Sequence, residues 1–500
     1  MSTSLPDIPL FIHGEFRRSH TQQWRQVVNP ATQEALARVP MATAEEVEAA
    51  IAAAKAAFAS WRHTPIGTRA RIFLRYQQLI RENLPALAAT LTAEQGKTLA
   101  DAEGELIRGL EVVEHAAAIG NLQLGEFATN VAKGVDTYTR LQPLGVCVGI
   151  TPFNFPAMIP LWMFPMAIAC GNTFVLKPSE QDPMVTMELV RLAHQAGIPA
   201  GVLNVVHGAA EVVDALCVHP DVRAISFVGS TRVGTHVYQR ASQAGKRVQC
   251  MMGAKNHAVV LPDARIEPTL DAIVGAAFGA AGQRCMAISV VILVGAARRW
   301  LPELVAKAQK LRVGAGTDNP DLGPVISCAA RQRIEALIQR GVEEGAKLEL
   351  DGRRPQVPAH LQQGNFIGPT IFSGVRPGMS IYEEEIFGPV LCVISTDTLD
   401  EAIAMINANP NGNGTAIFTQ SGAAARRFET EIEVGQVGIN VPIPVPVATF
   451  SFSGSRASKL GDLGPYGKQA ILFYTQTQTI TARWFDDDTV GGVNTTISMR

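Results

Sequence analysis

The amino-terminal part of the chain carries apolar residues at helical spacing. Thr43-Ala-Glu-Glu46 has the sequence of a capping box, in which Thr and Glu side chains satisfy free backbone N–H groups at a helix start. The apolar residues that follow recur one helical turn apart: Val47, Ile51, Ala54 and Phe58. A second helical pattern runs from about Thr98 to His115. We therefore expect this part to be helical.

From Gly145 the pattern changes to short β-branched runs that alternate with helical segments. The runs are 146–150, 174–176, 203–206, 224–228 and 248–251, and each ends in a loop with Gly or Pro. Residues 159–176 are apolar enough to raise the question of a membrane span, but Pro160, Pro165, Gly171 and Asn172 interrupt them. Strand–helix alternation predicts a doubly wound parallel sheet, with ligands at the carboxyl ends of its strands.

A second α/β stretch begins near Met252, includes a strand at 290–294 and continues past Val390. Two alternating segments, 125–142 and the tail from Ala470 onward, fit neither core. The predicted fold class is therefore α/β, with a Rossmann-type domain formed by 1–124 and 143–251. A second α/β domain spans 252–460, and a small β element is formed by 125–142 and 470–500. Orphan strands of this kind suit pairing between subunits.

The composition is that of a packed soluble protein. The 500 residues exceed what one hydrophobic core supports, which favours two large domains. With 47% apolar residues and a formal net charge of -2, the chain lacks the basic excess of nucleic-acid binders, and we expect neither nucleic acid nor membrane as a partner. The seven cysteines contain no CxxC, which argues against disulfides or a zinc site. Without a secretory signal in the first residues, we predict a cytoplasmic location.

Two short motifs suggest a dinucleotide site. Gly229-Ser-Thr-Arg-Val-Gly234 follows a strand and opens a helix, where free N–H groups and the helix dipole can bind an anion. Lys177-Pro-Ser-Glu180 follows another strand, and there Glu180 would accept ribose hydroxyls and repel a 2′-phosphate, which favours NAD over NADP. Taken singly, each motif is more often an ordinary turn without a ligand.

Two further motifs supply candidate catalytic groups. Gly282-Gln-Arg-Cys285 puts Cys285 on a glycine-marked loop beside Arg284, whose charge would favour the nucleophilic thiolate. Most lone cysteines are buried packing residues, and we expect this of the other six. In Thr151-Pro-Phe-Asn-Phe-Pro156, the amide of Asn154 could donate to a developing oxyanion. Asn in a Pro-rich loop is otherwise usual turn chemistry.

Together these motifs resemble the aldehyde dehydrogenase superfamily over nearly the whole chain. The correspondence extends to Glu384-Glu-Ile-Phe-Gly-Pro-Val390 and Phe452-Ser-Gly-Ser455. The resemblance implies that the Rossmann-type domain binds NAD, that the second domain is catalytic, and that the β element joins subunits into a homo-oligomer, a dimer or a tetramer. It also implies Cys285 as the nucleophile, and Asn154 with the Cys285 N–H as the oxyanion hole.

The resemblance further implies a set of cofactor contacts. Lys177 and Glu180 would lie at the adenosine ribose, Ser230 at the pyrophosphate, Glu385 at the nicotinamide ribose and Phe387 near the nicotinamide. The other cofactor positions that it implies are Thr151, Phe153, Gln181, Gly229 and Met252. No metal ion is expected.

One motif departs from the hydrolytic members of the superfamily. They carry Glu-Leu-Gly-Gly-Lys, with the glutamate as general base for water, where this chain has Met251-Met-Gly-Ala-Lys255. A thioether cannot take a proton, and a positioned base contributes ~10²–10⁴-fold. Coenzyme A, whose thiol has a pKa of about 8.5, would therefore accept the acyl group. With Arg108-Gly-Leu-Glu-Val-Val-Glu-His115, the motif looks like that of acylating members that oxidise methylmalonate semialdehyde.

Methylmalonate and malonate semialdehyde carry a β-carboxylate, which Arg can hold in a bidentate fork. Arg284, adjacent to Cys285, is one candidate, although it could instead form a structural ion pair. Arg108 and Phe452 are substrate positions that the resemblance implies. The products would be propanoyl-CoA and acetyl-CoA, with carbon dioxide lost from the enzyme-bound thioester.

Three other functions fit the same motifs. The first is a hydrolytic NAD-dependent dehydrogenase that gives the free acid through another carboxylate base. The second is a catalytically silent protein on this scaffold, against which the set Cys285, Asn154 and Glu385 argues. The third is the reverse reaction, reduction of an acyl-CoA.

Overall fold

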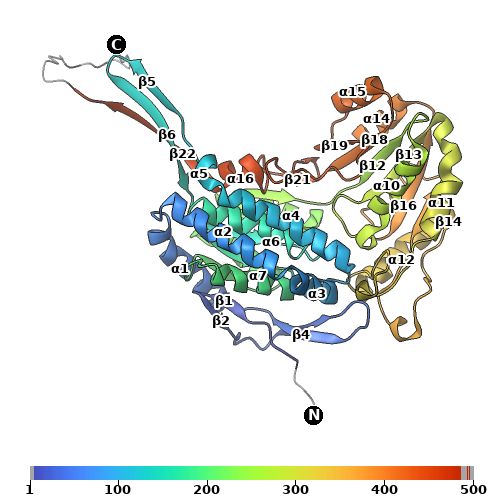
Figure 1. The fold of residues 1–500 in the computed structure, drawn as a ribbon, viewed down its shortest axis with the longest axis horizontal. Coiled ribbons are helices and arrows are strands. Elements are labelled where there is room, and N and C mark those ends of the chain that lie inside the picture. Colours follow the sequence, from blue (N-terminus) through green and yellow to red (C-terminus); the bar gives the residue numbers. More distant parts are fainter. Residues whose placement is uncertain (1–4, 486–492, 494, 496–500) are drawn as a thin grey trace.

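The computed structural model describes residues 5–485, 493 and 495, which form two lobes and a protruding arm (Figure 1). The first lobe contains a sheet of eight strands in the order β2-β1-β9-β8-β7-β10-β11-β21. Their bounds are β1 Leu10–Ile12, β2 Glu15–Arg17, β7 Val146–Ile150, β8 Thr173–Lys177, β9 Leu203–Val205, β10 Val222–Val228, β11 Arg247–Met251 and β21 Lys459–Leu460. The neighbouring strands β9, β8, β7, β10 and β11 pair in parallel, which confirms the doubly wound sheet.

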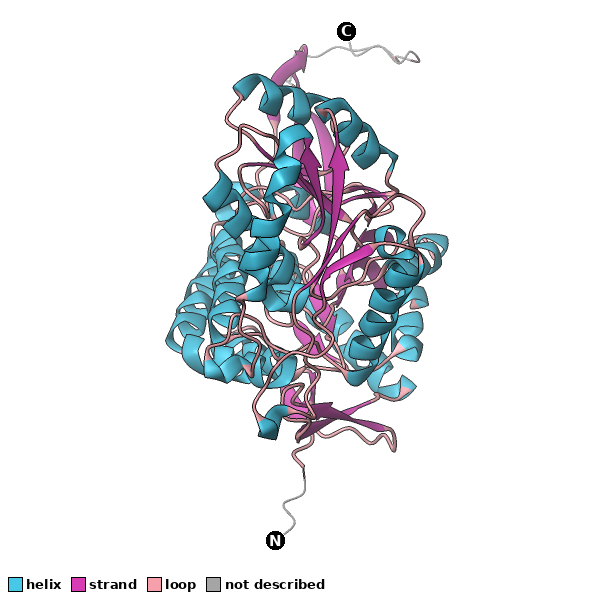
Figure 2. Cartoon of the chain, turned by 90° about the vertical axis from the view of Figure 1, so that its right-hand side faces the viewer, coloured by secondary structure: helices cyan, strands magenta, loops and turns pink. Residues whose placement is uncertain are grey.

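Helices cover both faces of this sheet (Figure 2). α1 (Ala44–Trp61), α8 (Ala210–Val218) and α9 (Thr231–Gln243) bury their apolar side chains against one face. On the other face lie α2 (Ile66–Glu82), α3 (Leu84–Gln95), α4 (Leu99–Ala117), α6 (Met158–Ala169) and α7 (Met184–Gln195). The helix α6 and the strand β8 are buried throughout, as the interrupted apolar stretch predicts.

The second lobe is built on a sheet of seven strands in the order β14-β15-β16-β13-β12-β18-β19. The strands are β12 Asn256–Val260, β13 Ile288–Val294, β14 Lys347–Leu350, β15 Thr370–Ser373, β16 Val390–Thr396, β18 Gly414–Phe418 and β19 Gln436–Ile439. One face packs against α10 (Ile266–Phe278) and α11 (Leu301–Gln309). The other packs against α12 (Cys328–Glu343), α14 (Leu399–Ala408) and α15 (Gly422–Glu431).

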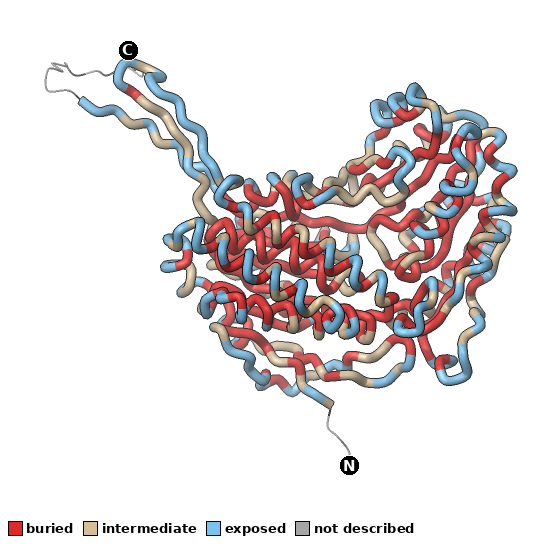
Figure 3. Tube along the Cα trace, viewed as in Figure 1, coloured by how far each residue is buried: buried red, intermediate tan, exposed pale blue. Residues whose placement is uncertain are grey.

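The arm is a three-stranded antiparallel sheet in the order β22-β6-β5. It consists of β5 (Phe127–Ala132), β6 (Val135–Pro143) and β22 (Thr475–Arg483). It projects away from both lobes, with residues that are mostly exposed or of intermediate burial (Figure 3). The segment predicted as one strand at 125–142 is thus a hairpin, which turns at Gly134 with a φ of 67°. Much of the predicted 484–500 portion of this element lies outside the described residues.

The two helices predicted in the amino-terminal part are confirmed as α1 and α4, but β1, β2 and the hairpin of β3 (Trp24–Val28) and β4 (Ala35–Pro40) precede α1. These strands are too short to give a clear alternation. The predicted capping box does begin α1, with both Thr43–Glu46 hydrogen bonds present. The tail from Ala470 starts as the helix α16 (Gly467–Tyr474), whose buried side chains pack in the same core cluster as α6, and becomes a strand only at Thr475.

The chain also returns to the first lobe after completing the second sheet. β21 pairs antiparallel with β11, with Leu460 opposite Cys250 and Lys459 opposite Met251. The last strand of the first sheet therefore comes from the range 252–460 that sequence patterns assign to the second domain. Two residues are too few to give a periodic signal, so this strand could not be found from the sequence.

Candidate active site

A cleft of about 840 Å³ lies at the carboxyl ends of β7, β8, β10 and β11. Its lining includes every residue predicted to contact the cofactor and both predicted catalytic side chains. These are Thr151, Phe153, Asn154, Lys177, Glu180, Gln181, Gly229, Ser230, Met252, Cys285, Glu385 and Phe387. The structure thus brings together segments that are far apart in the sequence, at the sheet edge where the strand rule expects a ligand.

One end of the cleft carries an ionised carboxylate. Lys177, the last residue of β8, places its Nζ 3.0 Å from Glu180 Oε2, and Arg25 Nη1 lies 3.2 Å from Glu180 Oε1. Burial opposes ionisation of Glu180, but the charge and hydrogen bond of Lys177, together with the charge of Arg25 and a backbone hydrogen bond, outweigh it and lower the pKa of that carboxyl. An ionised carboxylate at this point can accept hydrogen bonds from ribose hydroxyls.

The middle of the cleft offers donors for a pyrophosphate. Ser230 caps α9, and its side chain accepts from Val233 N at 3.5 Å, while Gly229 lies directly before it. The first turn of a helix carries free N–H groups that bind anions. The Oγ1 atom of Thr151, at the end of β7, is buried without a hydrogen-bond partner. These groups fit a dinucleotide.

The nucleophile loop is tightly joined to the loop that carries Phe387. Gly282 has a φ of 70°, and a Cβ there would lie 2.1 Å from the carbonyl oxygen of Gly388. Ala280 and Ala281 also have positive φ values, of 50° and 53°, as does Phe387, with 54°. Such conformations cost about 1–3 kcal/mol each for a residue with a side chain and are common at functional sites. The close approach requires glycine at 282.

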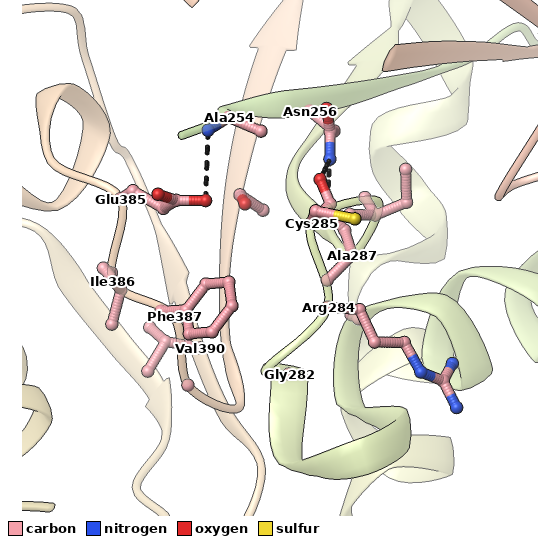
Figure 4. Close-up of a pocket in the computed structure, with 14 residues that line it drawn as sticks. Ala254, Asn256, Gly282, Arg284, Cys285, Ala287, Glu385, Ile386, Phe387 and Val390 are labelled. Atoms are coloured by element: carbon pink, nitrogen blue, oxygen red, sulfur yellow. Dashed lines mark hydrogen bonds between the residues drawn. The ribbon is translucent and has the colours of Figure 1, made fainter. Parts of the chain in front are cut away.

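Two asparagine side chains fix the peptide of Cys285. Asn256 Nδ2 donates to the carbonyl oxygens of Cys285 at 2.8 Å and Ala287 at 2.9 Å (Figure 4). Asn413 Nδ2 also donates to the Cys285 carbonyl, at 2.9 Å. Sequence reasoning missed both. Asn256 could have been found as a buried polar residue that opens an apolar strand.

The amide of Asn154 is held against the nucleophile loop. Its Nδ2 donates to the carbonyl oxygen of Gln283 at 3.0 Å, and its side chain is buried. A side-chain amide has two N–H groups, so one hydrogen remains to donate into the cleft beside Cys285. The arrangement can serve as an oxyanion donor.

Arg284 has a weaker effect on Cys285 than its place in the sequence suggests. Its Nη2 lies 2.5 Å from Asp101 Oδ1 in the first turn of α4, and its guanidinium points away from the Cys285 sulfur (Figure 4). Burial, and then the charge of Glu385, raise the pKa of the Cys285 thiol to about 12. Arg284 therefore forms the structural ion pair that the sequence left open. Its charge lowers the pKa of the Cys285 thiol, but too little to offset burial, and its guanidinium is engaged by Asp101.

Glu385 lies across the pocket from Cys285 (Figure 4). Its Oε1 accepts from Ala254 N at 3.0 Å. Burial raises the pKa of this carboxyl to about 7, against the opposing effects of the Ala254 hydrogen bond and the Lys255 ammonium. The carboxyl therefore changes its charge close to neutral pH.

The other predicted substrate residues lie outside the cleft lining. Arg108 is bound to Glu111, with Nη1 2.6 Å from Oε2, and its Nη2 donates to the Pro446 carbonyl at 2.8 Å. Phe452 is buried, with its ring centroid 5.5 Å from that of Trp162. Phe452 lies in the apolar cluster against which Cys285 packs, and Tyr466 of the same cluster donates to the same Pro446 carbonyl at 3.1 Å.

Met251 ends β11 and is buried in the same apolar cluster as Cys285. The position therefore holds a thioether packed among apolar side chains. Of the other cysteines, five are buried as predicted, but Cys328 is exposed in the first turn of α12, which corrects that expectation.

Within the described residues, no cluster of three or more His, Cys, Asp or Glu side chains could hold a metal ion. Nor does any described helix have the length and apolar character to cross a bilayer.

Comparison with known proteins agrees with this geometry. The model of the aldehyde dehydrogenase family matches residues 16–480. The methylmalonate-semialdehyde/malonate-semialdehyde dehydrogenase [acylating], mitochondrial, of Rattus norvegicus is 57% identical, over 97% of this chain and 91% of its own length. The crystal structure of the methylmalonate-semialdehyde dehydrogenase from Oceanimonas doudoroffii has a TM-score of 0.95 at 46% identity, over 96% of this chain and 99% of that chain. A Sinorhizobium meliloti 1021 structure complexed with NAD has the same TM-score and identity, over 97% and 99%.

One prediction is overturned by these relatives. The curated relatives from animals, from the amoeba Dictyostelium discoideum and from Arabidopsis thaliana are named mitochondrial, so the predicted cytoplasmic location is wrong. Free cysteines indicate a reducing compartment, but they do not distinguish one reducing compartment from another.

Proposed function

The chain belongs to the aldehyde dehydrogenase family, and from this premise we propose that it oxidises methylmalonate semialdehyde and malonate semialdehyde with NAD and transfers the acyl group to coenzyme A. The products are propanoyl-CoA and acetyl-CoA, with release of carbon dioxide. The observation that carries the acylating reaction is Met251, a buried thioether where hydrolytic members have a glutamate base.

The first step is addition of Cys285 to the aldehyde. A bond forms between its sulfur and the carbonyl carbon, the π electrons move to oxygen, and the thiol proton is released to solvent. The free amide N–H of Asn154 donates to the resulting oxyanion, and preorganised donors of this kind supply much of the rate enhancement in acyl chemistry. When bound, NAD supplies the acceptor for the hydride that leaves the substrate carbon, which gives a thioester on Cys285.

The chain's own residues provide the cofactor contacts. Lys177 and Glu180 would hold the adenosine ribose, Ser230 and the start of α9 the pyrophosphate, and Glu385 the nicotinamide ribose. Support for these assignments comes from their shared position along one cleft and from the buried, unpartnered Oγ1 of Thr151.

Release of the acyl group needs a second nucleophile. The β-carboxylate leaves as carbon dioxide, its C–C bond electrons pass into the thioester carbonyl, and the carbon then takes a proton. The thiolate of coenzyme A attacks the remaining thioester and Cys285 departs as the thiolate. Water competes poorly because Met251 cannot accept its proton, whereas a thiol is partly ionised near neutrality without help.

The test is the rate of NADH production from several aldehydes, each with and without coenzyme A. We expect a stoichiometric burst followed by a slow phase without coenzyme A, and sustained turnover with it. Fast sustained turnover without coenzyme A would instead establish the hydrolytic alternative, and absence of a burst would favour the silent protein.

We also propose that the protein is a homo-oligomer assembled through the arm. Phe127 and Val131 on β5 are exposed on a two-sided ribbon, and β19, the edge strand of the second sheet, exposes Ile439. Exposed apolar side chains and unpaired strand edges favour association. Sedimentation of the wild type and of Phe127→Asp tests this, and a monomeric wild type would contradict it.

A further inference from the structure

A fully buried ion pair lies behind the loop that carries Asn154. Lys97 follows α3 and Glu105 lies within α4; their side chains are 1% and 0% exposed, with Nζ 2.5 Å from Oε2. Removing two charges from water costs several kcal/mol per ion, and a buried pair is stable only if further hydrogen bonds satisfy both groups. The partners that satisfy this pair therefore indicate what it holds in place.

Those further hydrogen bonds all reach the segment 154–158. Lys97 Nζ donates to the backbone carbonyl of Asn154 at 2.8 Å and lies 4.4 Å from the ring centroid of Phe155. Glu105 Oε1 accepts from Ala157 N at 2.8 Å and from Met158 N at 3.0 Å, at the start of α6. The pair thus fixes the loop on both sides of Phe155.

Asn154 is consequently held at two points. Lys97 holds its backbone carbonyl from behind, and the Gln283 carbonyl of the nucleophile loop holds its side-chain amide in front. With both ends fixed, the remaining amide N–H has one direction, into the cleft. A displacement of 1 Å at a catalytic group can cost about 10²-fold in rate.

We propose that Lys97 and Glu105 are positioning residues that set the direction of the oxyanion donor Asn154. Neither contacts the substrate, and both act through the backbone of the loop. The inference rests on the proposed function, in which the amide of Asn154 stabilises the oxyanion.

The experiment separates oxyanion stabilisation from the reactivity of the thiol. In Lys97→Met, we expect the rate of the NADH burst to fall about 10- to 100-fold, below the ~10²–10³-fold loss typical for deletion of an oxyanion donor. Modification of Cys285 by methyl methanethiosulfonate needs no oxyanion donor and should stay within about twofold of wild type. NAD binding should change as little, because Lys97 and Glu105 contact the segment 154–158 and none of the cofactor residues.

Lys97→Met leaves the Glu105 carboxylate buried without its partner, which can prevent folding. The variant Lys97→Met/Glu105→Gln removes both charges and should fold, with the burst still reduced. Lys246→Met is the matched control, since Lys246 is a buried lysine whose Nζ donates to the His219 and Val222 carbonyls, remote from the cleft. Its burst should equal that of wild type.

A double-mutant cycle with Asn154→Ala decides the question. If Lys97 acts through Asn154, adding Lys97→Met to Asn154→Ala causes no further loss of burst rate. Losses that multiply, or a wild-type burst in Lys97→Met/Glu105→Gln, would overturn the positioning role. A wild-type burst in Asn154→Ala alone would instead show that the proposed oxyanion donor is wrong, and the inference would fall with it.

Discussion

The thiol of Cys285 allows a quantitative test of the electrostatics of the site. Its pKa is raised to about 12 by burial and then by the charge of Glu385, so at pH 8 only about one thiol in 10⁴ is ionised. Burial raises the pKa of Glu385 to about 7, so this carboxyl is charged above that pH and neutral below it. The effect of Glu385 on Cys285 should therefore itself depend on pH.

Glu385→Gln removes the negative charge that opposes formation of the thiolate. Above pH 8, where the wild-type carboxylate is ionised, we expect Cys285 to react about tenfold faster in the variant, equivalent to a lowering of its pKa by about one unit. Below pH 6 the wild-type carboxyl is protonated, and both proteins should react at the same rate. The ratio of the two rates should rise through pH 7.

The assay is modification by methyl methanethiosulfonate without NAD between pH 5.5 and pH 9.5, followed by the mass of the peptide that carries Cys285, because Cys328 is exposed and also reacts. Arg284→Gln is the control and should change the rate less than about twofold, because Arg284 is paired with Asp101 and has the weakest influence on the thiol. A rate ratio for Glu385→Gln that is constant across this range would refute the reasoning, as would a large loss in Arg284→Gln.

Three further variants test other parts of the site. Met251→Glu should increase release of the free acid without coenzyme A, mainly at neutral to alkaline pH where the buried carboxylate is ionised. If product analysis shows no free acid from a folded, NAD-binding variant, the missing base does not explain the acylating reaction. Arg108→Gln should lower kcat/KM for malonate semialdehyde about 10- to 100-fold more than for propanal, whereas equal losses would make this arginine structural. Gly282→Ala should abolish the NADH burst, because the added Cβ would collide with the Gly388 carbonyl. NAD affinity, measured by calorimetry, should stay within about threefold, because this collision lies outside the cofactor cleft. A normal burst would show that the loops of Gly282 and Gly388 can separate.

The cleft could be predicted because its residues occupy the ends of strands, and strand ends meet at one edge of a parallel sheet. Lys177, Ser230 and Asn154 were found in this way, from the apolar run that precedes each of them. The direction of a side chain could not be predicted. Arg284 is adjacent to Cys285 in sequence, but its orientation depends on Asp101, which lies in α4 of the other lobe.

The hydrogen-bond network that supports Asn154 and Cys285 could not be predicted from the sequence either. Lys97, Glu105 and Asn413 are polar residues in positions that resemble solvent-exposed turns or helix faces, and they acquire their roles only when distant elements pack together. Similarly, α16 was interpreted as a strand because a short apolar run has no clear period, and its contacts with α6 decide its conformation.

The pairing of β21 with β11 has a consequence for how the protein is made. A ribosome delivers the chain from its amino terminus, and domains generally fold as they emerge. Here the edge of β11 receives its neighbour only after the entire second sheet has been synthesised. The backbone groups of Cys250 and Met251 on this edge stay without their final partner throughout that interval. In the nascent chain, a strand edge beside the future cleft is thus open to pairing with other strands until β21 has been made.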